Sequence, residues 1–119
     1  MTHTERRTQI RRINRLIKKW HQVLGLDEWR VIHEYVDGAS DMPHGFQDGG
    51  YVATTQANWQ YCEAVIRWDV RVMAELEDEY LEESFLHECF HILVAEIGDE
   101  PHGSEERVVT KLARILMRV

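Results

Sequence analysis

The sequence predicts a single α+β domain, residues 1–119, in which a small three-stranded sheet packs against helices. Apolar residues recur at helical spacing near both ends of the chain, whereas the middle alternates apolar and polar residues as strands do. A length of 119 residues suits one domain with its own core. The expected order is helix, strand, strand, strand, helix, helix, with the strands mainly antiparallel.

The N-terminal helix is expected to span residues 4–24 and to end at Gly25. Its apolar positions are Ile10, Ile13, Leu16, Ile17, Trp20 and Leu24. Half of the 14 Lys and Arg residues of the chain lie between Arg6 and Lys19, on the remaining helix surface. We interpret them as a solvated face, and the alternative is a basic docking face for nucleic acid or an acidic partner.

Three segments are expected to be strands: residues 29–36, 51–58 and 61–70. The third has the clearest pattern, because Ala64, Ile66 and Trp68 alternate with polar residues such as Glu63 and Arg67. This alternation is typical of a strand that is covered on one face only.

Two helices are expected to follow. The first spans residues 78–97, because Asp78 and Glu79 favour the positive end of a helix dipole and Gly98 favours a helix end. The second runs from about Ser104, as its N-cap, to the C-terminus. Its apolar face comprises Val109, Leu112, Ala113 and Leu116.

Composition excludes several classes of protein. No apolar run is long enough to span a bilayer, and the N-terminus lacks the apolar segment of a secretory signal. Cys62 and Cys89 are too few for a disulfide scaffold, and we expect two reduced, buried thiols. We therefore expect a cytoplasmic protein without a membrane partner. A net charge of −7 argues against a general nucleic-acid binder.

Chemistry is expected at residues 86–91, LHECFH, which contain the pattern H-E-x-x-H. On a helix, residues four apart share a face, so His87 and His91 can direct two imidazoles at one point. Zinc accepts such nitrogens at about 2.0–2.1 Å. Glu88 lies close enough in angle to reach a zinc-activated water without being a ligand itself.

The surrounding helix supports a metal site. Apolar residues cover most of its circumference: Leu81, Phe85, Leu86, Cys89, Phe90, Ile92, Leu93, Val94 and Ile97. Such a helix is expected to be central, where unpaired His87, Glu88 and His91 would be costly to bury. A metal ion offsets that cost, whereas the alternative is two surface histidines on an acidic helix.

A catalytic zinc site needs a third protein ligand, which must come from elsewhere in the chain. Glu106, Glu105 and His102 are the downstream candidates. Glu106 shares a helix stripe with Thr110 and Ala113, and Ala113 would allow close approach of the two helices. Thr110, one turn after Glu106, could give a supporting hydrogen bond.

The residues from Tyr61 to Ala95, YCEAVIRWDVRVMAELEDEYLEESFLHECFHILVA, and the later EERVVTKLARIL together resemble small phage and prophage zinc-metallopeptidase-like proteins. The resemblance covers about half of the chain and implies a minimal zincin-like fold. It also implies a gluzincin-type site, with His87, His91 and Glu106 as zinc ligands and Glu88 as catalytic base. The resemblance further implies that the chain is a hydrolase, specifically a protease, and that it is phage-encoded.

A second resemblance is to SprT-like metalloproteases, whose third ligand is a His in an H-G element. The sequence PHGSEE, residues 101–106, is similar and would make His102 the ligand. The chain departs from that family because the aromatic residue after H-G and a downstream zinc ribbon of cysteines are missing. A metzincin pattern is absent, since the position six residues after His91 is Ile97.

The expected reaction is hydrolysis of a peptide or protein substrate by zinc-activated water, with Glu88 as general base. We expect an extended substrate to pair with the edge of the strand Tyr61–Trp68. Tyr61, Tyr80 and His44 are candidate substrate contacts by residue type. The alternatives are a catalytically silent zinc-binding protein in phage–host interaction, or a protease acting on DNA-associated proteins. The oligomeric state is not predicted.

Overall fold

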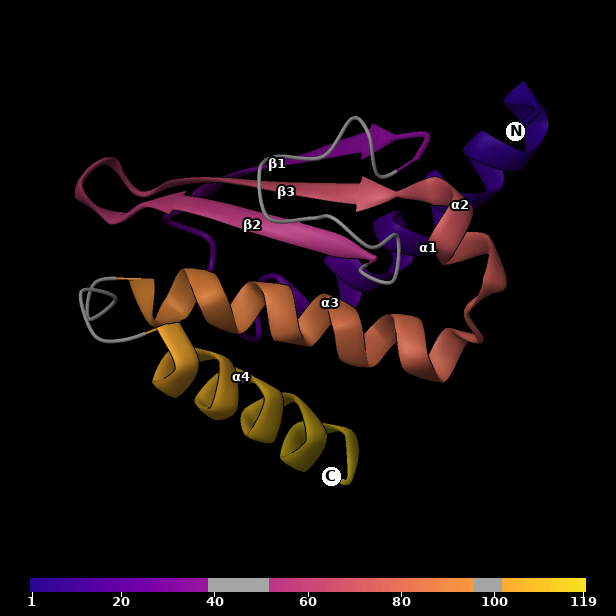
Figure 1. Cartoon of the computed structure of the whole chain (residues 1–119). Helices are drawn as coiled ribbons and strands as arrows, with labels where there is room; N and C mark the ends of the chain where they lie inside the picture. The colour runs from indigo at the N-terminus through magenta and orange to yellow at the C-terminus, as the bar shows by residue number, and fades with distance from the viewer. Residues whose placement is uncertain (39–51, 96–101) are drawn as a thin grey trace.

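The computed structural model describes residues 1–38, 52–95 and 102–119. Along the chain the elements are α1 (His3–Trp20), β1 (Arg30–Val36), β2 (Ala53–Asn58), the 3₁₀ turn η2 (Trp59–Tyr61), β3 (Glu63–Asp69), α2 (Val70–Glu75), α3 (Asp78–Leu93) and α4 (His102–Met117) (Figure 1). The predicted α+β class is confirmed. None of the helices in these ranges is long and apolar enough to cross a membrane.

The three strands form a mixed sheet in the order β1-β3-β2. β3 pairs in parallel with β1 and antiparallel with β2, so the prediction of a mainly antiparallel sheet is wrong. The connection between β1 and β2 is too long for a tight hairpin, so it does not force these neighbours in sequence to pair. β3 is the central strand, and its edges are therefore not free to receive a substrate strand as the sequence suggested.

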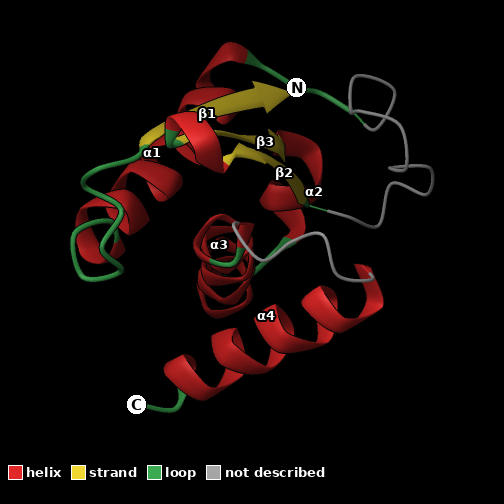
Figure 2. Cartoon of the chain, turned by 90° about the vertical axis from the view of Figure 1, so that its left-hand side faces the viewer, coloured by secondary structure: helices red, strands yellow, loops and turns green. Residues whose placement is uncertain are grey.

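α1 and α3 cover one face of the sheet, and α4 lies on the far side of α3 (Figures 1 and 2). The predicted alternation in β3 is confirmed, because Ala64, Ile66 and Trp68 are buried against these helices. The opposite face is polar around Arg67, which bonds Glu34 and Gln56 on the neighbouring strands. α3 therefore lies between the sheet and α4, as expected for a helix with apolar surface on most of its circumference.

Several element boundaries differ from prediction. α1 ends at Trp20, four residues early, and α3 ends at Leu93 in a tightened turn at Val94. α4 begins at His102, so Ser104 is not its N-cap. The expected helix end at Gly98 lies outside the described residues.

Two further features were not predicted. The short helix α2 begins where the Asp69 carboxylate accepts hydrogen bonds from the backbone amides of Arg71 and Val72.

Both cysteines are free, but Cys62 is exposed in a positive-φ turn while Cys89 is buried. The expectation of two buried thiols is therefore wrong for Cys62.

One basic residue of α1 has a structural role. The guanidinium of Arg12 is only 11% exposed and donates to the Gln9 side chain, to Asp78 and to the backbone carbonyls of Met73 and Leu76. It therefore ties α1 to the end of α2 and the start of α3. Five aligned donors make arginine the side chain suited to this position.

His33 of β1 is half-buried in an aromatic cluster with Trp68 and Phe85, whose ring centroids lie 6.0–6.3 Å from it. The Trp68 indole N–H donates to His33 Nδ1 at 3.0 Å, so a proton at Nδ1 would break this bond. Burial, and then the charge of His21, lower the pKa of His33 from 6.5 to about 4.

This shift predicts acid sensitivity. The unfolded chain binds a proton at His33 below pH 6.5 and the folded chain only below about 4, so stability is lost as the pH falls through that window. We expect the loss to be roughly 2–3 kcal/mol. Chemical denaturation at several pH values should show a flatter profile for His33→Gln, whose amide oxygen can still accept from Trp68. The same profile in both proteins would contradict this assignment.

Candidate metal centre

His87, His91 and Glu106 bring three possible ligand atoms within 4.8 Å of one another and could hold a metal ion. The two histidines lie one turn apart on α3, so their rings face the same side, and their Nε2 atoms are 3.2 Å apart. Glu106, in the first turns of α4, places one carboxylate oxygen 3.2 Å from His87 Nε2 and the other 2.8 Å from His91 Nε2. The packing of α4 on α3 therefore creates the cluster.

The chemistry of this donor set fits a divalent cation. The Glu105 carboxylate can only accept a hydrogen bond from His91 Nδ1, so neutral His91 presents a lone pair at Nε2. His87 can do the same when its Nδ1–H donates to Thr110. Two lone pairs and a carboxylate would then converge and repel one another without a cation. Their separations are close to the distance of about 3.3 Å between donors on a tetrahedral zinc ion.

Residues behind the cluster orient both imidazoles. Glu105 Oε1 is 2.7 Å from His91 Nδ1, and Thr110 Oγ1 is 3.3 Å from His87 Nδ1. Such partners fix the tautomer and aim the ligating nitrogen. Burial lowers the pKa of His87, while the nearby Glu106 carboxylate opposes this effect, so the neutral ring needed for ligation is favoured.

The structure distinguishes two of the three candidates for the third ligand, Glu105 and Glu106. Glu105 approaches Nδ1 of His91, the outer ring nitrogen, which points away from the cluster. It is not in the three-residue group, because adjacent residues such as Glu105 and Glu106 project about 100° apart on a helix. The side chain of His102 lies outside the described residues. The geometry supports Glu106, and its assignment as a ligand stays a prediction.

Glu88 lies next to the cluster but is not part of it. Its side chain is 9% exposed, and one carboxylate oxygen is 4.0 Å from His87 Nε2. The other oxygen accepts a hydrogen bond of 2.7 Å from Thr55 Oγ1 on β2. Burial raises the pKa of Glu88 to about 7, although the Thr55 hydrogen bond acts in the opposite direction. A carboxylate poised in this way can exchange protons with a group bound near the cluster.

β2 is an edge strand of the described sheet, and it lies next to this carboxylate. One side of β2 pairs with β3, and within the described residues no strand pairs with the other side. The contact between Thr55 and Glu88 was not predicted, since a threonine in a strand carries no signal of a partner on a distant helix. Similarly, the sequence made Glu105 a candidate ligand, whereas the structure places it as a hydrogen-bond partner of His91 Nδ1.

The other candidate substrate contacts do not gain support. Tyr80 is 55% exposed in the first turn of α3, about 10 Å along the helix from His87. Tyr61 is 73% exposed in η2. His44 lies outside the described residues.

No protein-family model matches the chain, and searches of curated proteins and of solved structures likewise found no match. The function of the chain is therefore inferred from the geometry of the site.

Proposed function

We propose that this chain is a zinc-dependent metallopeptidase with a minimal zincin-like fold. The observation that carries the proposal is the convergence of His87, His91 and Glu106 beside the buried carboxylate of Glu88. A site with three protein donors and an adjacent base is typical of catalytic zinc, whereas structural zinc sites usually have four protein ligands and no base.

The residues of the site have separate roles in this proposal. His87, His91 and Glu106 hold the zinc ion, while Glu105 and Thr110 orient the two imidazoles. When bound, zinc supplies Lewis-acid activation of water for hydrolysis at neutral pH. Glu88 accepts a proton from the attacking water and returns it to the amine that leaves. Thr55 holds the Glu88 side chain toward β2.

The outer edge of β2, which no described strand covers, is the best position for the substrate. A polypeptide in extended conformation can add a strand there through main-chain hydrogen bonds. Thr55 lies on this strand and bonds Glu88, so the scissile bond of such a substrate would pass near the base. Glu106 is 56% exposed, which leaves the cluster open to solvent on the α4 side.

Metal content and cleavage test the proposal together. We expect about one zinc per chain, and cleavage of a generic unfolded protein that a chelator removes and added zinc restores. Glu106→Ala should lose both zinc and cleavage, because it removes one of three protein ligands. Zinc content can be measured by mass spectrometry after exhaustive dialysis, and cleavage by the release of labelled fragments.

Control variants distinguish the ligand candidates. His102→Ala should retain zinc, whereas Glu105→Ala should bind it roughly 10–100-fold more weakly, because it removes a partner of a ligand and not a ligand. Equal zinc retention in Glu106→Ala and His102→Ala would overturn the choice of Glu106. A wild-type protein without bound zinc or zinc-dependent cleavage would overturn the function.

A further inference from the structure

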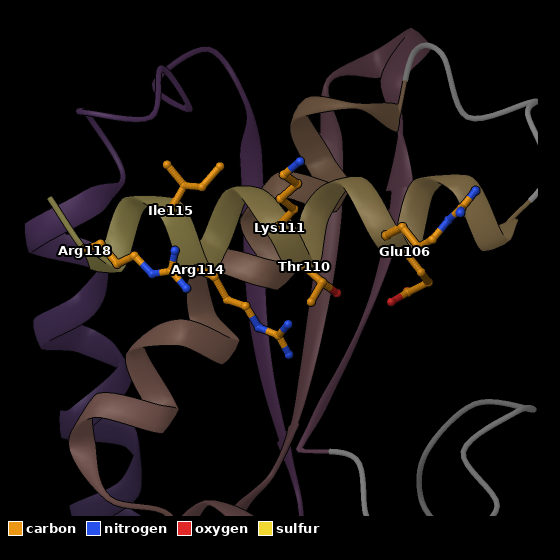
Figure 3. Close-up of a pocket in the computed structure, with 7 residues that line it drawn as sticks. Glu106, Thr110, Lys111, Arg114, Ile115 and Arg118 are labelled. Atoms are coloured by element: carbon orange, nitrogen blue, oxygen red, sulfur yellow. The ribbon is translucent and has the colours of Figure 1, made fainter.

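The outer surface of α4 forms a shallow cationic hollow with a volume of about 530 Å³. It is lined by Glu106, Arg107, Thr110, Lys111, Arg114, Ile115 and Arg118. Figure 3 shows Lys111 and Ile115 on one side of the helix and Glu106, Thr110 and Arg114 on the other. We use the name cationic hollow for this surface.

Its four basic residues follow the helix period, at positions i, i+4, i+7 and i+11 from Arg107. They therefore form one stripe, about 16 Å long at the rise of an α-helix. All four are exposed, and they project away from Val109 and Ala113, which are buried against α3. Packing of α4 does not explain this stripe of like charge.

The stripe is basic although the chain as a whole carries a net charge of −7. Only one of the four cations has an acidic partner in the described residues: Arg114 Nε lies 3.6 Å from Glu83. Ile115 adds an exposed apolar surface beside the charges. A bound segment with both acidic groups and hydrocarbon would match this combination.

The cationic hollow is continuous with the candidate metal centre. Glu106 and Thr110 line its end, and the same two residues contact His87. A polypeptide that extends from the metal centre along α4 would pass the basic side chains in turn. About five residues of extended chain would cover the stripe, at about 3.3 Å per residue.

We propose that the cationic hollow binds an acidic stretch of the polypeptide substrate, next to the bond that is cleaved. The proposal rests on the peptidase function and adds a substrate class to it. Nucleic acid is the less favoured occupant, because none of the residues that line the hollow is aromatic and its bases would find no side chain to stack on.

Binding is measured first, on zinc-loaded Glu88→Gln protein. The probes are two labelled ten-residue peptides that differ only in carrying five Glu or five Gln. The triple variant Arg107→Gln/Lys111→Gln/Arg118→Gln should bind the Glu peptide about tenfold more weakly and the Gln peptide unchanged. The control Arg11→Gln/Arg15→Gln/Lys18→Gln changes net charge equally on the exposed face of α1. This control should keep the preference for Glu.

Cleavage is measured second, with Glu88 intact, as the ratio of kcat/KM for substrates carrying the Glu or Gln stretch beside the same cleavable sequence. The ratio should exceed one and fall in the α4 variant alone. Equal binding of both peptides, or an equal loss in the α1 control, would overturn the proposal even if neutral substrates are cleaved. A single-stranded oligonucleotide that binds the hollow more tightly than the Glu peptide would also overturn it. Acid-selective binding without any cleavage would overturn the peptidase function and support the acidic-segment surface.

Discussion

Glu88→Gln is expected to abolish most cleavage while leaving zinc bound. The substitution keeps the size of the side chain and a carbonyl oxygen for the Thr55 hydrogen bond, but it removes the proton acceptor. Loss of a general base lowers the rate by about 10²–10⁴-fold. The measurement is kcat/KM on an unfolded protein substrate, together with zinc content and the unfolding midpoint.

Zinc content makes this experiment specific, because Glu88 lies outside the three-residue ligand group. A variant that lost zinc would show that Glu88 acts through the cluster and not as a base. Undiminished cleavage would show that the base lies elsewhere. Full zinc occupancy of the wild type without activity on a broad peptide library would favour the zinc-binding protein as the alternative.

The largest stability effect is expected for Arg12→Ala. Without the guanidinium, the Leu76 carbonyl and the side-chain oxygen of buried Gln9 each lose the hydrogen bond from Arg12. The Met73 carbonyl also loses its bond from Arg12 and keeps only the one from the Leu76 backbone N–H. Hydrogen bonds from charged donors contribute about 1.5–3 kcal/mol each, and solvent can replace part of this, so we expect a loss of about 3 kcal/mol. Denaturant unfolding should show this as a lower midpoint with an unchanged slope.

Neighbouring positions provide matched controls. Arg11→Ala removes an exposed arginine from the same helix and should change stability by no more than about 0.5 kcal/mol. Arg12→Lys keeps the charge but loses the planar fork that reaches several acceptors, so it should fall between the two. Equal stability of the Arg11 and Arg12 variants would show that the guanidinium contacts of Arg12 contribute nothing measurable.

Arg12 also shows what the sequence could not reveal about the fold. Periodicity predicted the helix α1, but seven basic residues share its polar surface and nothing local marks the one that reaches α2. The strands were likewise predicted as segments, whereas their order depends on long-range pairing of β1 with β3. Local patterns define elements, and contacts between distant elements define the sheet.

The candidate site divides in the same way. The spacing of His87 and His91 is a local property of one helix, so their shared face was predictable. Glu106 could be proposed because it opens the next helix, but its approach depends on how α4 crosses α3. The hydrogen bonds of Glu105 and Thr55 depend on that crossing and on the position of β2, and neither has a signal in the sequence.

The position of Glu105 and Glu106 at the start of α4 has a consequence for the C-terminal segment. The Glu105 carboxylate contacts Nδ1 of His91, and the Glu106 carboxylate contacts Nε2 of the same ring. Within the described part of α4, only Val109 and Ala113 are fully buried, so apolar packing alone holds this helix weakly. A metal ion bound by residues of both α3 and α4 would hold the two helices together. By thermodynamic linkage, tighter metal binding then means a larger free energy to detach α4, and a looser α4 means a weaker hold on the metal.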